Sequence, residues 1–169
     1  GFTLVFAANQ ADAQTPRTRI LFLLDASGSM KNTWNDRTTE SKWSSAKKIL
    51  REIADSLRKE KNIEIGLRVY GHQSRPTERN CNDTQLEVGF SKNSFGYIQS
   101  KLGKIIPKGI TPIAASLRKA GNDFPRVPGR HIIILMTDGE ESCDGDPCAI
   151  ARELEEKGIV MKHFVIGIG

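Results

Sequence analysis

The stretch that decides the fold is Ile20-Leu21-Phe22-Leu23-Leu24-Asp25-Ala26-Ser27-Gly28-Ser29-Met30. Its first five residues are all apolar, which is typical of a strand buried on both faces in the middle of a parallel sheet. The acid that follows opens a turn of small and hydroxyl-bearing residues. In open α/β sheets, ligands bind outside the carboxyl ends of the strands. We therefore expect a ligand site directly after this strand.

The remaining pattern predicts one α/β domain. Apolar residues at three- and four-residue steps indicate a helix over about residues 40–61, and strict alternation indicates a strand over 63–70 with a partly solvated face. Further strands are expected at 85–90 (an antiparallel edge), 131–136 and 160–168, and further helices at 94–102, 112–121 and 147–157. This order predicts a doubly wound, mostly parallel sheet with helices on both faces, a Rossmann-like three-layer sandwich.

A set of oxygen-bearing side chains is expected to meet at the carboxyl end of this sheet. One group lies in the first turn, one acid follows a second apolar strand, and one hydroxyl is expected to be the N-cap of the helix that begins at Pro112. The set is Asp25, Ser27, Ser29, Thr111 and Asp138. Oxygen donors with only two formal charges favour Mg²⁺ that retains waters, with Mn²⁺ or Ca²⁺ as alternatives.

These three segments resemble the metal-ion-dependent adhesion site of von Willebrand factor type A (VWA) domains, and the resemblance covers about residues 19–169. It implies that Ser27, Ser29 and Thr111 bind the metal directly, and that Asp25 and Asp138 bind it directly or through water. It also implies a non-catalytic module whose metal accepts an acidic group of a protein partner. The loop at residues 144–147, with the cysteines beside it, is similar to a bacterial, exported branch of the family.

Two other functions remain open from the residues alone. A magnesium-dependent hydrolase of phosphate esters would use Asp25 as a nucleophile, but no second acid stands two positions later, and a Gly-rich phosphate loop is not evident. An intracellular scaffold that partners an ATPase would fit other VWA domains, although the N-terminus and the cysteines argue against it. We expect no enzyme activity.

The N-terminus and the cysteines favour an exported protein. Residues 1–13 contain an apolar segment followed by Ala11-Asp12-Ala13, which is typical of the end of a secretory leader. The alternative is a short helix or strand that packs on the domain. Residues 14–169 would then be the VWA domain, and the resemblance implies that its last helix and strand are missing. Cys143 could pair with Cys148, or Cys81 with either of them, and the sequence leaves this pairing open.

Charge and hydropathy exclude other classes of partner. The net charge is +5, but the basic residues are spread along the chain, so we expect no nucleic-acid binding. No apolar run reaches the roughly 20 residues of a transmembrane helix.

A few further side chains are candidates for minor roles. Trp34 in the loop beside the site is a candidate anchor for a partner, and His72 is a candidate rim residue near the metal. His131 and His163 are expected to pack on strands. The acidic loop at residues 140–146 is interpreted as solvated rather than as a second, calcium-type site.

Overall fold

A five-stranded sheet forms the middle layer, in the order β3-β2-β1-β4-β5. The structure is a computed structural model that describes residues 16–165. The strands are β1 (Thr18–Asp25), β2 (Ile63–Tyr70), β3 (Thr84–Ser91), β4 (Arg130–Thr137) and β5 (Ile159–Val165). All neighbouring strands are parallel except β2 and β3, which are antiparallel. The predicted mostly parallel sheet with one antiparallel edge is confirmed.

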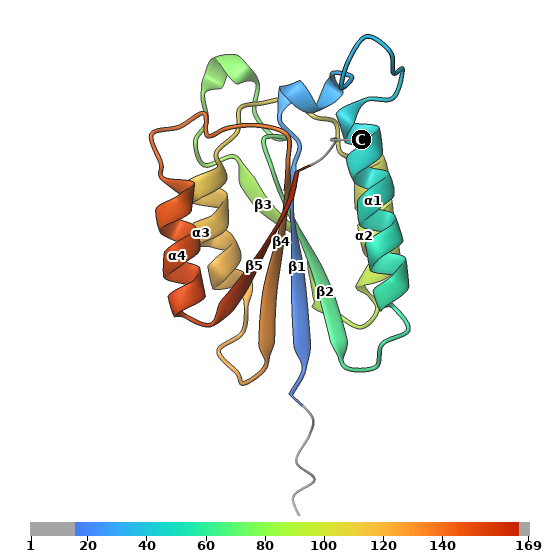
Figure 1. Cartoon of the computed structure of the whole chain (residues 1–169), viewed down its shortest axis with the longest axis vertical. Helices are drawn as coiled ribbons and strands as arrows, with labels where there is room; N and C mark the ends of the chain where they lie inside the picture. Colours follow the sequence, from blue (N-terminus) through green and yellow to red (C-terminus); the bar gives the residue numbers. More distant parts are fainter. Residues whose placement is uncertain (1–15, 166–169) are drawn as a thin grey trace, which may run out of the picture.

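The helices cover both faces of the sheet (Figure 1). They are α1 (Lys42–Leu57), α2 (Ser94–Lys104), α3 (Ile113–Asp123) and α4 (Pro147–Glu156), with short 3-10 turns η1 (Gly28–Lys31) and η2 (Pro76–Glu78). Helices α1 and α2 lie on one face, and α3 and α4 on the other (Figure 1). Each face has its own apolar core, so the three-layer prediction is confirmed.

Strand β1 is central because its apolar side chains supply both cores. Phe22 and Leu24 pack in the core beside α1 and α2, whereas Leu21 and Leu23 pack in the core beside α3 and α4. All four are fully buried. Burying one such side chain stabilises the fold by about 1.5–3 kcal/mol, so this strand alone contributes much of the stability.

The first helix is shorter than predicted. Residues 40–61 were expected, but α1 begins only after Ser41, whose Oγ accepts a hydrogen bond from the backbone N of Ser44 at 3.1 Å. A serine in this position satisfies one of the free backbone donors of the first turn, which makes it a good helix start. The helix ends at Leu57, where the apolar stripe also ends.

The predicted solvated face of β2 is wrong. Glu64 and Arg68, which made the strand appear alternating, are only 8% and 7% exposed. Glu64 pairs with Arg17 at 2.6 Å and with Arg19 at 2.9 Å. Arg68 donates to both carboxylate oxygens of Asp123, at 2.6 and 2.8 Å. Charged side chains can be buried when partners of this kind satisfy them, so a charged position in a strand does not require a wet face.

The two strand histidines differ in their surroundings. His131 stacks on Phe124 with ring centroids 4.7 Å apart, which confirms that it is packed. Burial, and to a smaller extent the charge of Arg19, lowers the pKa of His131 below its usual value. His163 is exposed, so the prediction that it packs is wrong. Its strand, β5, is an edge of the described sheet, with a neighbour on one side only.

The ends of the chain limit two predictions. Within residues 16–165, none of the helices combines the length and the apolar character needed to span a bilayer. The predicted leader at residues 1–13, and the end of the last strand at residues 166–168, lie outside the described residues. A missing last helix and strand therefore stays a prediction.

Candidate metal centre

Four of the five candidate metal ligands lie at the carboxyl ends of β1 and β4, which are neighbours in the sheet. Asp25 is the last residue of β1, and Ser27 and Ser29 follow in the turn that leads into η1. Asp138 directly follows β4. Because parallel strands end at the same edge of a sheet, the two distant segments meet there.

Hydrogen bonds connect three of these side chains in series, from Ser27 through Ser29 to Asp138. Ser27 Oγ and Ser29 Oγ are 3.2 Å apart, and Ser29 Oγ donates to Oδ1 of Asp138 at 3.1 Å. Two neighbouring ligands of an octahedral Mg²⁺, each about 2.1 Å from the metal, are about 3.0 Å apart. The oxygens are hard donors at suitable separations, so the residues present fit a divalent cation.

Asp25 has a different role because it is fully buried. Its Oδ1 accepts a hydrogen bond from the backbone N of Ser27 at 2.8 Å, and its Oδ2 accepts one from Thr137 Oγ1 at 2.7 Å. Burial raises the pKa of Asp25 above its usual value, although these two hydrogen bonds favour the charged form. The carboxylate therefore fixes the serine turn against β4, where it positions Ser27.

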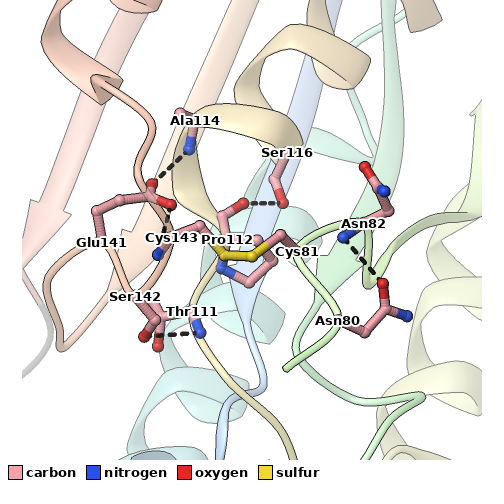
Figure 2. The surroundings of a disulfide bond; sticks show 10 residues. All are labelled: Asn80, Cys81, Asn82, Thr111, Pro112, Ala114, Ser116, Glu141, Ser142 and Cys143. Carbon is pink, nitrogen blue, oxygen red and sulfur yellow. Dashed lines mark hydrogen bonds between the residues drawn. A yellow bond between two sulfur atoms is a disulfide. The ribbon is translucent and has the colours of Figure 1, made fainter. Parts of the chain in front are cut away.

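The segment that contains Thr111 is attached to both other segments. The backbone N of Gly28 donates to Gly109 O at 2.8 Å, which joins it to the serine turn. Thr111 N donates to Ser142 Oγ at 3.1 Å, and Ser142 N donates back to Thr111 O at 3.0 Å, as Figure 2 shows in part. These contacts use the backbone of Thr111, and the role of its hydroxyl as a metal ligand stays a prediction.

The predicted N-cap role of Thr111 is wrong, because helix α3 begins at Ile113 and Pro112 occupies the N-cap position. One free donor of the first turn is satisfied from another loop. Glu141 accepts a hydrogen bond from the backbone N of Ala114 at 2.8 Å (Figure 2). An acid that reaches a helix start from another loop can replace a local cap, since it also meets the positive end of the helix dipole.

The open question of cysteine pairing is answered by a disulfide between Cys81 and Cys143 (Figure 2). It joins the loop after β2 to the loop after β4, and Cys143 directly follows Ser142. Cys148 is free and exposed. The disulfide therefore holds the loop on which the Thr111 segment is fastened.

The acidic loop at residues 140–146 is partly used for capping. Glu141 also accepts a hydrogen bond from Cys143 N at 3.1 Å, and Asp146 is the N-cap of α4, accepting from Ala149 N at 3.0 Å. Within the described part of the chain, no three His, Cys, Asp or Glu side chains cluster as metal ligands. The candidate centre is not such a cluster, because three of its five proposed donors are hydroxyls and only two are carboxylates.

One residue of the site was missed from the sequence. Lys42, the first residue of α1, places its Nζ 2.8 Å from Oδ2 of Asp138 and 4.9 Å from the centre of the Trp34 ring. Trp34, the predicted partner anchor, is half-buried and packs against the core beside α1. The sequence contained no signal for Lys42, since it belongs to a different element from Asp138 and reaches it only in the folded chain.

His72 is not engaged with the candidate ligands. Its Nε2 lies 2.7 Å from Oε1 of Glu87 on β3, and Lys101 pairs with the same carboxylate at 3.3 Å. These residues line a hollow of about 310 Å³ together with the exposed Lys104 and Lys108. Lys108 N donates to Ala26 O at 3.0 Å, so this basic hollow adjoins the serine turn.

The fold and the hydroxyl-rich site define the class of protein: the chain belongs to the von Willebrand factor type A domain family, whose sequence model matches residues 20–169. Domains of this family are typically non-enzymatic interaction modules. The chain is 32% identical to YwmC of Bacillus subtilis (strain 168), in a match that covers 96% of this chain and 71% of YwmC.

Two solved structures are similar in fold. One is an aerotolerance-related membrane protein from Bacteroides fragilis, with 22% identity and a TM-score of 0.69, covering 89% of this chain and 68% of that one. The other is the pilus adhesin SpaC from Lactobacillus rhamnosus GG, with 14% identity and a TM-score of 0.69, covering 90% of this chain and 24% of SpaC. At these identities the likeness shows the fold alone.

Proposed function

We propose that this chain is a non-catalytic, Mg²⁺-dependent protein-binding module of an exported protein. The observation that carries the proposal is the continuous chain of hard oxygen donors from Ser27 through Ser29 to Asp138, at 3.2 and 3.1 Å. A bound divalent cation would supply an electron-poor site that accepts a carboxylate oxygen of the partner. Mn²⁺ or Ca²⁺ would be alternative ions.

Each candidate residue has a definite task in this proposal. Ser27, Ser29 and Thr111 would hold the cation with neutral hydroxyls. Asp138 would bind the cation directly or through water and supply negative charge. Asp25 would orient Ser27 through its hydrogen bond with the backbone N of that residue. Because the ligand set is poor in negative charge, the cation keeps most of its positive charge for the partner.

The surroundings of the site support an acidic partner. Lys101, Lys104 and Lys108 place positive charge around the hollow that adjoins the serine turn, and Ile106 between them is exposed. Complementary charges of this kind speed association and select the partner. We therefore propose a protein ligand that presents a carboxylate to the metal.

The burial of Asp25 supports a non-catalytic role. A nucleophilic carboxylate needs an oxygen that can reach the substrate, whereas each oxygen of Asp25 already accepts a hydrogen bond and the residue is fully buried. The phosphate-ester hydrolase would need this group at the surface. Purified protein assayed with a phosphate monoester and MgCl₂ should show no turnover, and robust turnover would overturn this part of the proposal.

Export is supported by the disulfide between Cys81 and Cys143, because such bonds persist mainly in oxidising compartments. We propose a periplasmic, cell-surface or secreted protein whose leader ends at Ala13. Cell fractionation with an antibody against the domain would place it, and recovery in the cytosol would favour the intracellular scaffold.

The metal site is tested by calorimetric titration of the domain with MgCl₂ and MnCl₂. Asp25→Ala and Ser29→Ala should abolish the binding heat, whereas Asp36→Ala, at an exposed carboxylate outside the site, should leave it unchanged. Circular dichroism checks that the variants stay folded. Asp25→Ala leaves two buried donors, Ser27 N and Thr137 Oγ1, without their acceptor, at a cost of about 1–3 kcal/mol each, whereas Ser29→Ala leaves both of these bonds in place. Unchanged heats in both site variants would refute the site.

The partner is sought by pull-down from the cell exterior, with and without a chelator. A partner that is retained only with Mg²⁺, and that the Ser29→Ala domain does not retain, would support the proposal. Retention that is insensitive to both changes would contradict a metal-mediated contact.

A further inference from the structure

Lys42 brings a positive charge into the candidate metal centre. Its Nζ contacts Oδ2 of Asp138 at 2.8 Å, and the other oxygen of the same carboxylate accepts a hydrogen bond from Ser29. The side chain of Lys42 is 19% exposed and that of Asp138 is 1% exposed. An ion pair this well shielded is screened less by salt than a surface pair.

The position of Lys42 on its helix makes this contact informative. Lys42 is the first residue of α1, where the helix dipole is positive and a cation is unfavourable. The ammonium is compensated by Asp138 on one side and by the ring of Trp34 on the other. The lysine is therefore held in the site by specific partners from two other segments.

From this geometry we infer that Lys42 is an internal cation that competes with the divalent metal for Asp138. The inference rests on the proposed function, because it assigns a role at the same site. A divalent cation bound at the Ser27 and Ser29 hydroxyls would share the Asp138 carboxylate with the ammonium, and like charges around one carboxylate repel each other. Lys42 thus weakens metal binding and keeps Asp138 paired at low metal concentration.

The competition has a consequence for the loop between η1 and α1. A metal that shares the Asp138 carboxylate would weaken its contact with Lys42, and the contact between the ammonium and Trp34 would then loosen. Trp34 is half-buried, whereas Trp43, the second tryptophan, is only 7% exposed. Metal binding should therefore alter the fluorescence of Trp34, and this loop should become available to the partner.

The test compares Mg²⁺ affinity, measured by calorimetry, between the unchanged chain and the variants Lys42→Met and Lys42→Arg. Lys42→Met should lower the dissociation constant for Mg²⁺ about tenfold, which corresponds to about 1.4 kcal/mol of binding free energy. Lys42→Arg keeps the charge and should stay near the unchanged chain. The matched control is Lys47→Met, because Lys47 also lies on α1 and over a tryptophan, with its Nζ 5.6 Å from the Trp43 ring.

A second readout needs no metal. In excess chelator, Lys42→Met should lower the melting temperature more than Lys47→Met, because it leaves the carboxylate of Asp138 buried without its cation.

A third readout follows the loop. In the unchanged chain, MgCl₂ should shift the tryptophan emission, and Trp34→Phe should remove most of that shift. An emission change that survives Trp34→Phe would contradict the loosening of the loop.

The outcomes separate this inference from the proposed function. If the unchanged chain binds Mg²⁺ and Lys42→Met binds it equally or more weakly, the function stands and the competition is overturned. If only Lys42→Met binds Mg²⁺, the competition is supported and the unchanged chain is not a magnesium-dependent module. If neither binds Mg²⁺, both are overturned.

Discussion

Replacing both cysteines of the disulfide, Cys81→Ser with Cys143→Ser, should destabilise the domain strongly. The bridge joins residues that are 62 apart in sequence. The entropy of closing a loop of that length in the unfolded chain corresponds to about 4 kcal/mol at 25 °C. For a chain of this size, about 4 kcal/mol lowers the melting temperature by roughly 8–16 °C.

Urea denaturation followed by circular dichroism measures this loss directly, and Cys148→Ser is the matched control. Cys148 is free and exposed, so its replacement should change the free energy of unfolding by less than about 0.5 kcal/mol. A double variant within about 1 kcal/mol of the unchanged chain would refute the reasoning. An equal loss in the Cys148→Ser variant would show that a different pair is bridged.

The same change should also weaken metal binding. Cys143 is next to Ser142, which exchanges two hydrogen bonds with the backbone of Thr111. Without the bridge, the loop that holds Thr111 is free to move, so calorimetry should show a larger dissociation constant for Mg²⁺. An unchanged constant would mean that these two hydrogen bonds position Thr111 without help.

Two further predictions concern the backbone beside the site and the pH dependence of stability. Gly71 has φ +75°, and a Cβ there would lie 2.9 Å from Ser27 Cα. Gly71→Ala should therefore lower the free energy of unfolding by roughly 1–3 kcal/mol. It should also weaken Mg²⁺ binding, because Ser27 is a candidate ligand. Gly89→Ala is the control, because a Cβ at Gly89 meets nothing within 4 Å. Both changes are measured by urea denaturation and by calorimetry, and equal effects would contradict the reasoning. His131 has a lowered pKa in the folded protein, so as pH falls below about 6.5 the unfolded chain takes up the proton first and stability is lost. His131→Phe should flatten the fall in melting temperature between about pH 6.5 and pH 5, and an unchanged slope would contradict this assignment.

The sheet could be predicted because its central strands carry long apolar runs. The apolar runs of β1 and β4 predict strands that are buried on both faces. Asp25 is the last residue of β1 and Asp138 directly follows β4, so an acid marks the carboxyl end of each strand. Three of the candidate ligands, Asp25, Ser27 and Ser29, belong to one turn, so their proximity follows from the sequence alone. Asp138 joins them because the two strands are parallel neighbours.

Features that depend on distant partners could not be predicted in this way. Arg68 on β2 was interpreted as solvated because Asp123, its partner, comes 55 residues later. Lys42 had no signal for the same reason, since its contact with Asp138 spans 96 residues. The pairing of Cys81 required the loops after β2 and β4 to meet, which only the packed structure shows.

The central position of β1 has a mechanical consequence. A partner held at the proposed site, the serine turn, would pull on the end of this strand. Strand β1 is paired with β2 from Thr18 to Asp25 and with β4 from Thr18 to Leu24. Tension applied along β1 would load two parallel ladders at once, whereas each edge strand of the described sheet, β3 or β5, is held by one ladder. The proposed binding site thus lies at the end of a strand that two neighbours hold, rather than at an edge of the described sheet.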